Sequence, residues 1–351
     1  MMRMFVTILA ILLVRHAHSL DEPKSLPKPM SKSLPEPLFF SDDHCAFGVK
    51  TVSLFLYNSN IKGQKINVND ICEYVHPSQK VVFIIHGAVG SVLKDNFPDV
   101  ATALTQKGYT VFSVDWSQGA CTNMPNSDGV KEKTLAVMNA VAAGQRVARF
   151  VTKLVTECKF PLANVIFLGH SLGSHVAGFA AKVIQELKLG TIPLIIAGDP
   201  IDFVQGDPLT TPFSSRKCND RLCYTDTSCL KVLHTSSDGI GTRMGHLDLQ
   251  FNNGQTQPSC WWDATPSCSH LIVIQYILKV FENKCSFPGV PFKEGIAFVG
   301  SGPSYPSPNE TNCILVNDNL LDISCSIQGE YYVFVDCYTY CTEYAPQTCQ
   351  Q

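Results

Sequence analysis

Short apolar runs alternate with longer helical patterns from about residue 45 onward. The apolar runs cover residues 81–87, 109–116, 165–171, 194–200 and 230–237. Continuous apolar runs that end in polar or small residues are typical of strands buried in a parallel sheet. Helical patterns lie between them at 96–107, 134–158 and 174–188. This alternation predicts an α/β protein with a mostly parallel central sheet flanked by helices, and ligands bound at the carboxyl ends of the strands.

The N-terminus has the pattern of a secretory signal. Arg3 precedes an almost unbroken apolar stretch over residues 4–14, which is too short to cross a bilayer core of about 30 Å as a helix. The small residues Ala17 and Ser19 suit cleavage after Ser19, so residues 1–19 are predicted to be a signal peptide. The alternative is a buried N-terminal helix, against which the charged, Pro-rich segment that follows argues.

Residues 20–40 contain a short repeat, KSLPKP followed by KSLPEP, and five prolines. Proline removes backbone donors and disfavours both helix and sheet, so this segment is predicted to be extended, either as a propeptide or as a mature N-terminal tail. The rest, residues 41–351, is predicted to be a single catalytic domain with a Cys-rich C-terminal extension.

Cysteine content and charge narrow the compartment and the partners. Fifteen cysteines indicate an oxidising, extracellular environment, and the odd number leaves at least one outside intramolecular pairs. Removal of residues 1–19 takes away two arginines and no acid, which changes the formal net charge from −3 to −5. A polybasic surface for nucleic acid or anionic lipid is therefore not expected.

The sequence GHSLG places Ser171 between Gly169 and Gly173, where the strand near 165–169 must turn into a helix starting near Ser174. This is the pattern of a nucleophile elbow, which presents the serine hydroxyl at the sheet edge and directs a helix N-terminus toward developing negative charge. Such a serine needs a histidine to accept its proton and a carboxylate to orient that histidine.

Candidate partners follow Ser171 in the chain. Asp199 comes directly after the next strand and is favoured as the acid, and Asp202, beyond Pro200, is the competitor. Three histidines follow. His234 has the setting of a structural histidine, His246 precedes a strand-like LDLQF, and His270, in SCSHLIVIQYILKVF at the start of a long helix, is favoured as the base.

These residues resemble the animal lipase family that includes pancreatic lipase, and within it the phospholipases A1 of wasp and hornet venom. The matching pieces, spread over residues 45–285, are VVFIIHG, VDWSQGACTN, GHSLGSHVAGFAAK, GDP, VLHTSS and CSHL. The resemblance implies an α/β-hydrolase fold, a triad of Ser171, Asp199 and His270, and an oxyanion hole made by the backbone N–H groups of Ala88 and Leu172.

The chain departs from the family pattern at two positions: Ala88 stands where an aromatic residue is usual after HG, and Gly198 where leucine is usual before the aspartate. Because the donor at position 88 is a backbone group, the first change should alter pocket shape more than chemistry. His86 is expected to support this loop.

The resemblance also bears on the loops. It implies that Cys45 pairs with Cys121, that Cys218 and Cys223 close a tight loop, and that Cys260 and Cys268 enclose a seven-residue lid, WWDATPS. Phospholipases A1 of the family have such short loops, whereas triglyceride lipases have long ones. In this lid Trp261 and Trp262 suit the lipid head-group zone, with packing beneath the loop as the alternative.

The C-terminal part is short for a second domain. Only 68 residues follow Asn283, fewer than the roughly 100 of a β-sandwich, so no C-terminal β-sandwich domain is expected. Asn309, in the sequon NET, is predicted to be a glycosylation site in a surface loop.

The predicted function is that of a secreted phospholipase A1 that hydrolyses the sn-1 acyl ester of glycerophospholipids through an acyl-serine intermediate. It is expected to be a monomer that acts on phospholipid membranes or micelles, without cofactor or metal. A triacylglycerol or galactolipid lipase with the same triad is one alternative. A non-catalytic, yolk-like lipid-binding protein is another, against which the complete triad argues.

Overall fold

The computed structural model describes residues 45–122, 129–202, 211–292, 303–336, 340–341, 346 and 348–350. The predicted signal peptide at 1–19 and the Pro-rich segment at 20–40 lie outside these ranges. Among the described residues, no helix combines the length and the apolar character that a membrane span requires.

Eleven strands of the described chain form one sheet, in the order β10-β9-β11-β8-β7-β6-β5-β3-β4-β1-β2. They are β1 (Ser53–Tyr57), β2 (Lys62–Ile66), β3 (Val81–Ile85), β4 (Thr110–Asp115), β5 (Val165–His170), β6 (Ile192–Gly198), β7 (Thr227–His234), β8 (Leu247–Phe251), β9 (Phe287–Pro291), β10 (Ile314–Val316) and β11 (Gly329–Val333). The pairings from β11 to β4 are parallel, and the strands at both edges pair antiparallel.

The five predicted apolar runs became the central strands β3 to β7. Every residue of β3, β5 and β6 is buried, because helices cover both faces of a parallel sheet. Near the C-terminus, β11 pairs with β8 in the same sheet. The topology confirms the predicted α/β-hydrolase fold.

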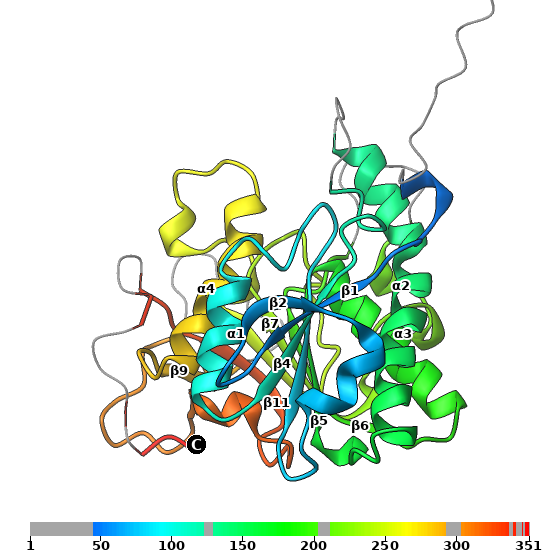
Figure 1. Cartoon of the computed structure of the whole chain (residues 1–351). Helices are drawn as coiled ribbons and strands as arrows, with labels where there is room; N and C mark the ends of the chain where they lie inside the picture. The colour runs from blue at the N-terminus through cyan, green and yellow to red at the C-terminus, as the bar shows by residue number, and fades with distance from the viewer. Residues whose placement is uncertain are drawn as a thin grey trace, which may run out of the picture. The chain divides into compact units, whose positions relative to one another are not determined.

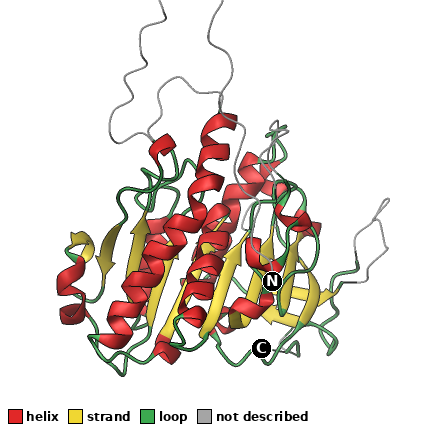
Figure 2. Cartoon of the chain, turned by 90° about the vertical axis from the view of Figure 1, so that its right-hand side faces the viewer, coloured by secondary structure: helices red, strands yellow, loops and turns green. Residues whose placement is uncertain are grey.

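Four α-helices of the described chain cover the two faces of the sheet (Figures 1 and 2). They are α1 (Phe97–Gln106), α2 (Val130–Thr156), α3 (Leu172–Glu186) and α4 (Ser267–Phe281). Figure 1 shows α1 and α4 together on one side and α2 and α3 on the other, and each pair packs against its own hydrophobic cluster. The helix predicted to start near Ser174 begins at Leu172, because a single residue, Ser171, makes the whole turn from β5.

Seven disulfides join described cysteines. The pairs are Cys45–Cys121, Cys72–Cys158, Cys218–Cys223, Cys229–Cys325, Cys260–Cys268, Cys285–Cys341 and Cys313–Cys349. They include the three pairs that the family resemblance implies. The fifteenth cysteine, Cys337, lies outside the described residues.

Candidate active site

Ser171 lies in a sharp turn between β5 and α3. Its backbone is at φ 56° and ψ −127°, a conformation that is sparsely populated for a residue with a side chain and costs about 1–3 kcal/mol. Both flanking glycines are required by close packing. A Cβ on Gly169 would lie 2.6 Å from Ser174 Cα, and one on Gly173 would collide with the Ile85 carbonyl at the end of β3. The turn therefore holds the Ser171 hydroxyl at the carboxyl edge of the sheet.

The structure brings Ser171, His270 and Asp199 together from three separate elements. The distance from His270 Nε2 to Ser171 Oγ is 2.7 Å, and that from His270 Nδ1 to Asp199 Oδ2 is 2.5 Å. Asp199 follows β6 directly, and His270 lies in the first turn of α4. With Nδ1–H donating to the carboxylate, the free lone pair of Nε2 faces the serine hydroxyl, which is the arrangement of a general base and its nucleophile.

Asp199 is fully buried and accepts hydrogen bonds on both carboxylate oxygens. Oδ1 accepts the backbone N–H groups of Thr235 at 2.8 Å and Ser236 at 3.1 Å, and Oδ2 also accepts the Ser236 hydroxyl. Burial alone would raise the pKa of the Asp199 carboxyl. The hydrogen bond and charge of His270, together with the donors from Ser236 and Thr235, outweigh burial and hold this pKa below its usual range.

His170, the residue before the serine, also contacts the site. Its Nε2 lies 3.0 Å from the backbone carbonyl of His270, and the two imidazole rings are 4.9 Å apart. Burial, assisted by the charge of His270, lowers the pKa of His170 to about 3, so the ring is neutral and donates Nε2–H to that carbonyl. Sequence reasoning missed this role and that of Ser236. The only available signal was their place beside Ser171 and in VLHTSS.

The competing candidates lie elsewhere. Asp202 binds Ser214 through both carboxylate oxygens, and His234 is buried against Asp248 with an Nε2–Oδ1 distance of 2.9 Å. His246 accepts the backbone N–H of Leu230 in the sheet. None of the three makes a hydrogen bond to Ser171 or His270.

Two backbone N–H groups are available beside the serine. Leu172 is the first residue of α3, where an N–H has no partner inside the helix. Ala88 N–H makes no hydrogen bond within the described chain, whereas the next residue, Val89, donates to Ala120. The loop that carries Ala88 is held by His86, whose Nδ1 contacts the Gly87 carbonyl at 2.9 Å.

A cavity of about 230 Å³ opens above these groups. It is lined by Ser171 and His270, by both candidate oxyanion donors, and by apolar residues from both helix pairs. The lining residues are Gly87, Ala88, Val89, Gly90, Asp95, Phe97, Lys133, Val137, His170, Ser171, Leu172, Ile201, Asp238, His270 and Leu271. An acyl chain would therefore find an apolar wall next to the serine.

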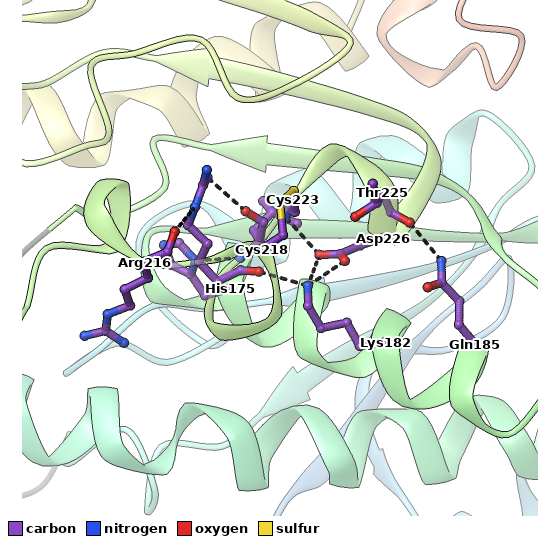
Figure 3. The surroundings of a disulfide bond; sticks show 10 residues. His175, Lys182, Gln185, Arg216, Cys218, Cys223, Thr225 and Asp226 are labelled. Carbon is purple, nitrogen blue, oxygen red and sulfur yellow. Dashed lines mark hydrogen bonds and ion pairs between the residues drawn. A yellow bond between two sulfur atoms is a disulfide. The ribbon is translucent and has the colours of Figure 1, made fainter.

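The short loop closed by Cys218–Cys223 is attached to α3, the helix that begins at the serine (Figure 3). Lys182 Nζ binds Asp226 at 2.5 Å and the Arg221 carbonyl at 2.9 Å. His175 Nδ1 accepts the backbone N–H of Leu222 at 3.1 Å. These contacts hold the loop against the side of α3.

The loop between Cys260 and Cys268 projects beside the start of α4. Trp261 and Trp262 are 81% and 66% exposed, so neither indole packs beneath the loop. Asp263 fixes the loop from within, because its carboxylate accepts the backbone N–H groups of Thr265 and Cys268 at 2.8 Å and 3.0 Å. The two aromatic rings therefore face solvent on a short, constrained loop.

Comparison with known proteins gives one consistent result. The Lipase family model matches residues 50–313. A phospholipase A1 of Solenopsis invicta is 35% identical and covers 96% of this chain and 97% of its own. A phospholipase A1 of Dinoponera quadriceps is 37% identical, covering 85% and 78%, and one of Vespula vulgaris is 34% identical, covering 73% and 77%.

Proposed function

The chain belongs to the lipase family, and from this premise we propose that it is a secreted phospholipase A1, which hydrolyses the sn-1 acyl ester of glycerophospholipids. The observation that carries the proposal is the hydrogen-bonded series Ser171–His270–Asp199 beside an apolar cavity. The substrate class follows from the phospholipases A1 to which the chain is similar over most of its length.

In the first half of the reaction, Ser171 Oγ attacks the ester carbonyl while His270 Nε2 accepts the serine proton. Asp199 stabilises the imidazolium that forms and keeps the ring oriented. The N–H groups of Ala88 and Leu172 would donate to the oxyanion, a contribution of about 3–4 kcal/mol for a donor in a serine hydrolase. His270 then returns the proton to the leaving glyceryl oxygen, and the acyl group remains on Ser171.

In the second half, water attacks the acyl-serine ester. His270 Nε2 accepts a proton from this water, and the same two N–H groups receive the second oxyanion. Collapse of the intermediate releases the fatty acid and returns the proton to Ser171 Oγ. The proton transfers use Ser171, His270 and Asp199, which are already hydrogen-bonded to one another.

The two short disulfide-closed loops favour phospholipids over triglycerides as substrates. A triglyceride needs a broad apolar surface for three chains, whereas a phospholipid brings a polar head group that tolerates water beside the site. The loop at Cys260–Cys268 is too short to form such a surface, and its exposed tryptophans suit the head-group zone.

Secretion is supported by the signal-like residues 1–19 and by the seven disulfides, which require an oxidising compartment. Asn309 is exposed in a turn between β9 and β10, as a glycosylated asparagine must be. We infer that the mature protein acts as a glycosylated monomer at the surface of membranes or micelles.

The proposal is tested by the positions of the fatty acids released from a mixed-acyl phosphatidylcholine, assayed beside triolein. Release of the sn-1 chain, with slower hydrolysis of triolein, is the expected result. A preference for triolein would refute the phospholipase assignment and favour the triacylglycerol lipase.

The catalytic roles are tested by substitution. Ser171→Ala should abolish hydrolysis of every ester without loss of folding, because the variant lacks the nucleophile. Asp199→Asn should reduce kcat severely, whereas the matched control Asp202→Asn, whose carboxylate contacts Ser214 instead of His270, should retain wild-type activity. The reverse pattern would transfer the role of the acid to Asp202.

A further inference from the structure

The cavity beside Ser171 contains two oppositely charged side chains that the proposed mechanism does not use. Lys133 extends from the first turns of α2, and Asp238 lies in the connection between β7 and β8. Both line the same cavity as Ser171 and His270. They border the α2–α3 side of the cavity, together with Val137 and Ile201, which pack on the hydrophobic cluster of that side.

Neither charge has a partner within the described chain. Lys133 Nζ and the Asp238 carboxylate make no hydrogen bond there, and they are more than 4.0 Å from each other and from every other opposite charge. Asp238 is only 9% exposed. Because this carboxylate lines the cavity and has no partner there, it is available to a cationic ligand.

The backbone fixes Asp238 where it is. Its N–H donates to Ser236 Oγ at 3.2 Å, and its carbonyl accepts the N–H of Asp202 at 2.9 Å. The next residue, Gly239, passes so close to the carboxylate of Asp199 that a Cβ there would lie 2.7 Å from Oδ1. The Asp238 side chain is therefore held beside the triad without being part of it.

We propose that Lys133 and Asp238 bind the zwitterionic head group of the phospholipid, with Lys133 on the phosphodiester and Asp238 facing the head-group ammonium. The assignment rests on the proposed phospholipase activity. In a glycerophospholipid only the glycerol carbons and one oxygen separate the sn-1 ester from phosphorus, so a cavity that holds this ester at Ser171 also reaches the phosphate.

The charge environment of Asp238 agrees with a cationic ligand. Burial raises the pKa of the Asp238 carboxyl above its usual value, although the charges of His270 and Lys133 act in the opposite direction. A head-group ammonium near Asp238 would favour the ionised form of its carboxylate. The negative charge of the bound phosphate would in turn be compensated by Lys133.

The experiment measures kcat/KM in detergent mixed micelles for phosphatidylcholine, phosphatidylglycerol and diacylglycerol. Lys133→Gln should lower the value for both phospholipids by about tenfold and leave diacylglycerol, which lacks the phosphate, within about twofold, because the variant loses the charge that binds the phosphate. Lys131→Gln removes the same charge from an exposed position on α2 outside the cavity lining and is the matched control. It should change none of the three values.

Asp238→Asn tests the ammonium half. It should lower the ratio of phosphatidylcholine to phosphatidylglycerol hydrolysis by about fivefold or more, because phosphatidylglycerol carries no ammonium. The ratio separates head-group recognition from any general loss of activity that the proximity of Asp238 to His270 causes. An unchanged ratio would overturn the role of Asp238.

Two further outcomes are decisive. An equal loss for phospholipid and diacylglycerol in Lys133→Gln would make Lys133 part of acyl-chain or triad packing and overturn the inference, while the phospholipase assignment would stand. Wild-type protein that cleaves diacylglycerol but neither phospholipid would instead refute the proposed function. Inorganic phosphate should not inhibit hydrolysis of a soluble ester, and an inhibition that Lys133→Gln abolishes would identify a small-anion site in place of the lipid head group.

Discussion

Ser236→Ala removes one of four hydrogen bonds to the Asp199 carboxylate. The hydroxyl binds Asp199 Oδ2, the oxygen that also accepts His270 Nδ1, and it lies 3.3 Å from that same nitrogen. A hydrogen bond to a buried charge contributes about 1.5–3 kcal/mol. If all of it appeared in the activation barrier, kcat would fall by about 10- to 100-fold.

The lower end of this range is expected for Ser236→Ala. Asp199 is ionised in both the ground state and the transition state, and the N–H groups of residues 235 and 236 still fix Oδ1. The effect is therefore confined to the orientation of His270. We expect kcat for a soluble short-chain ester to fall about tenfold while KM stays unchanged, because Ser236 does not line the cavity.

Two variants complete the test of Ser236. Ser236→Thr keeps the hydroxyl and should restore most of kcat, and Ser214→Ala, which removes the equivalent hydroxyl from Asp202, should have no effect. A Ser236→Ala enzyme with kcat within twofold of wild type would refute the positioning role. A parallel change in KM and thermal stability would show a general structural role instead.

Two other predictions concern stability and the lipid surface. Burial lowers the pKa of both His170 and His175 from 6.5 to about 3. Between these pH values the unfolded chain binds more protons than the folded protein does, so the stability of the fold falls as the pH falls from 6.5 toward 3. Between pH 7 and pH 5, each histidine should lower the free energy of unfolding, measured with urea, by about 2 kcal/mol. His175→Gln should remove about half of the pH dependence that the two histidines cause together, and an unchanged pH dependence would contradict this reasoning. Replacing Trp261 and Trp262 with Ala should lower activity on phospholipid vesicles by about tenfold and leave soluble esters within about twofold, because the indoles insert at the head-group zone; equal losses on both would mean that they support packing.

The central part of the fold could be predicted from the sequence because its strands are buried on both faces of the sheet, which requires apolar residues at nearly every position. β3, β5 and β6 are buried on both faces and are continuous apolar runs, so their place and type follow from composition alone. The strands toward the two ends of the sheet carry no such signal. β2, at one edge, reads KGQKI and is mostly exposed, and β9, the second strand from the other edge, contains two prolines, a residue that is depleted in strands.

The candidate site also contains some residues that a local sequence pattern predicts and others that it does not. Ser171 was predictable because its glycine neighbours serve a local turn, and Asp199 because it ends a recognisable strand. Ser236, His170 and Lys133 act across long sequence separations, with Ser236 and Asp199 lying 37 residues apart. No local pattern distinguishes such residues from an ordinary buried serine, a core histidine or a solvated lysine, so only the folded arrangement identified them.

The disulfides fall into two groups that share no chain segment. One joins residues between Cys45 and Cys158, and the other joins residues between Cys218 and Cys349. The stretch from 159 to 217, which carries both Ser171 and Asp199, contains no cysteine. Within these seven crosslinks, a single proteolytic cut in that stretch would divide the protein into two covalently separate halves. Ser171 and Asp199 are therefore joined to the two disulfide-linked parts of the chain by backbone, sheet hydrogen bonds and packing, and by none of these seven disulfides.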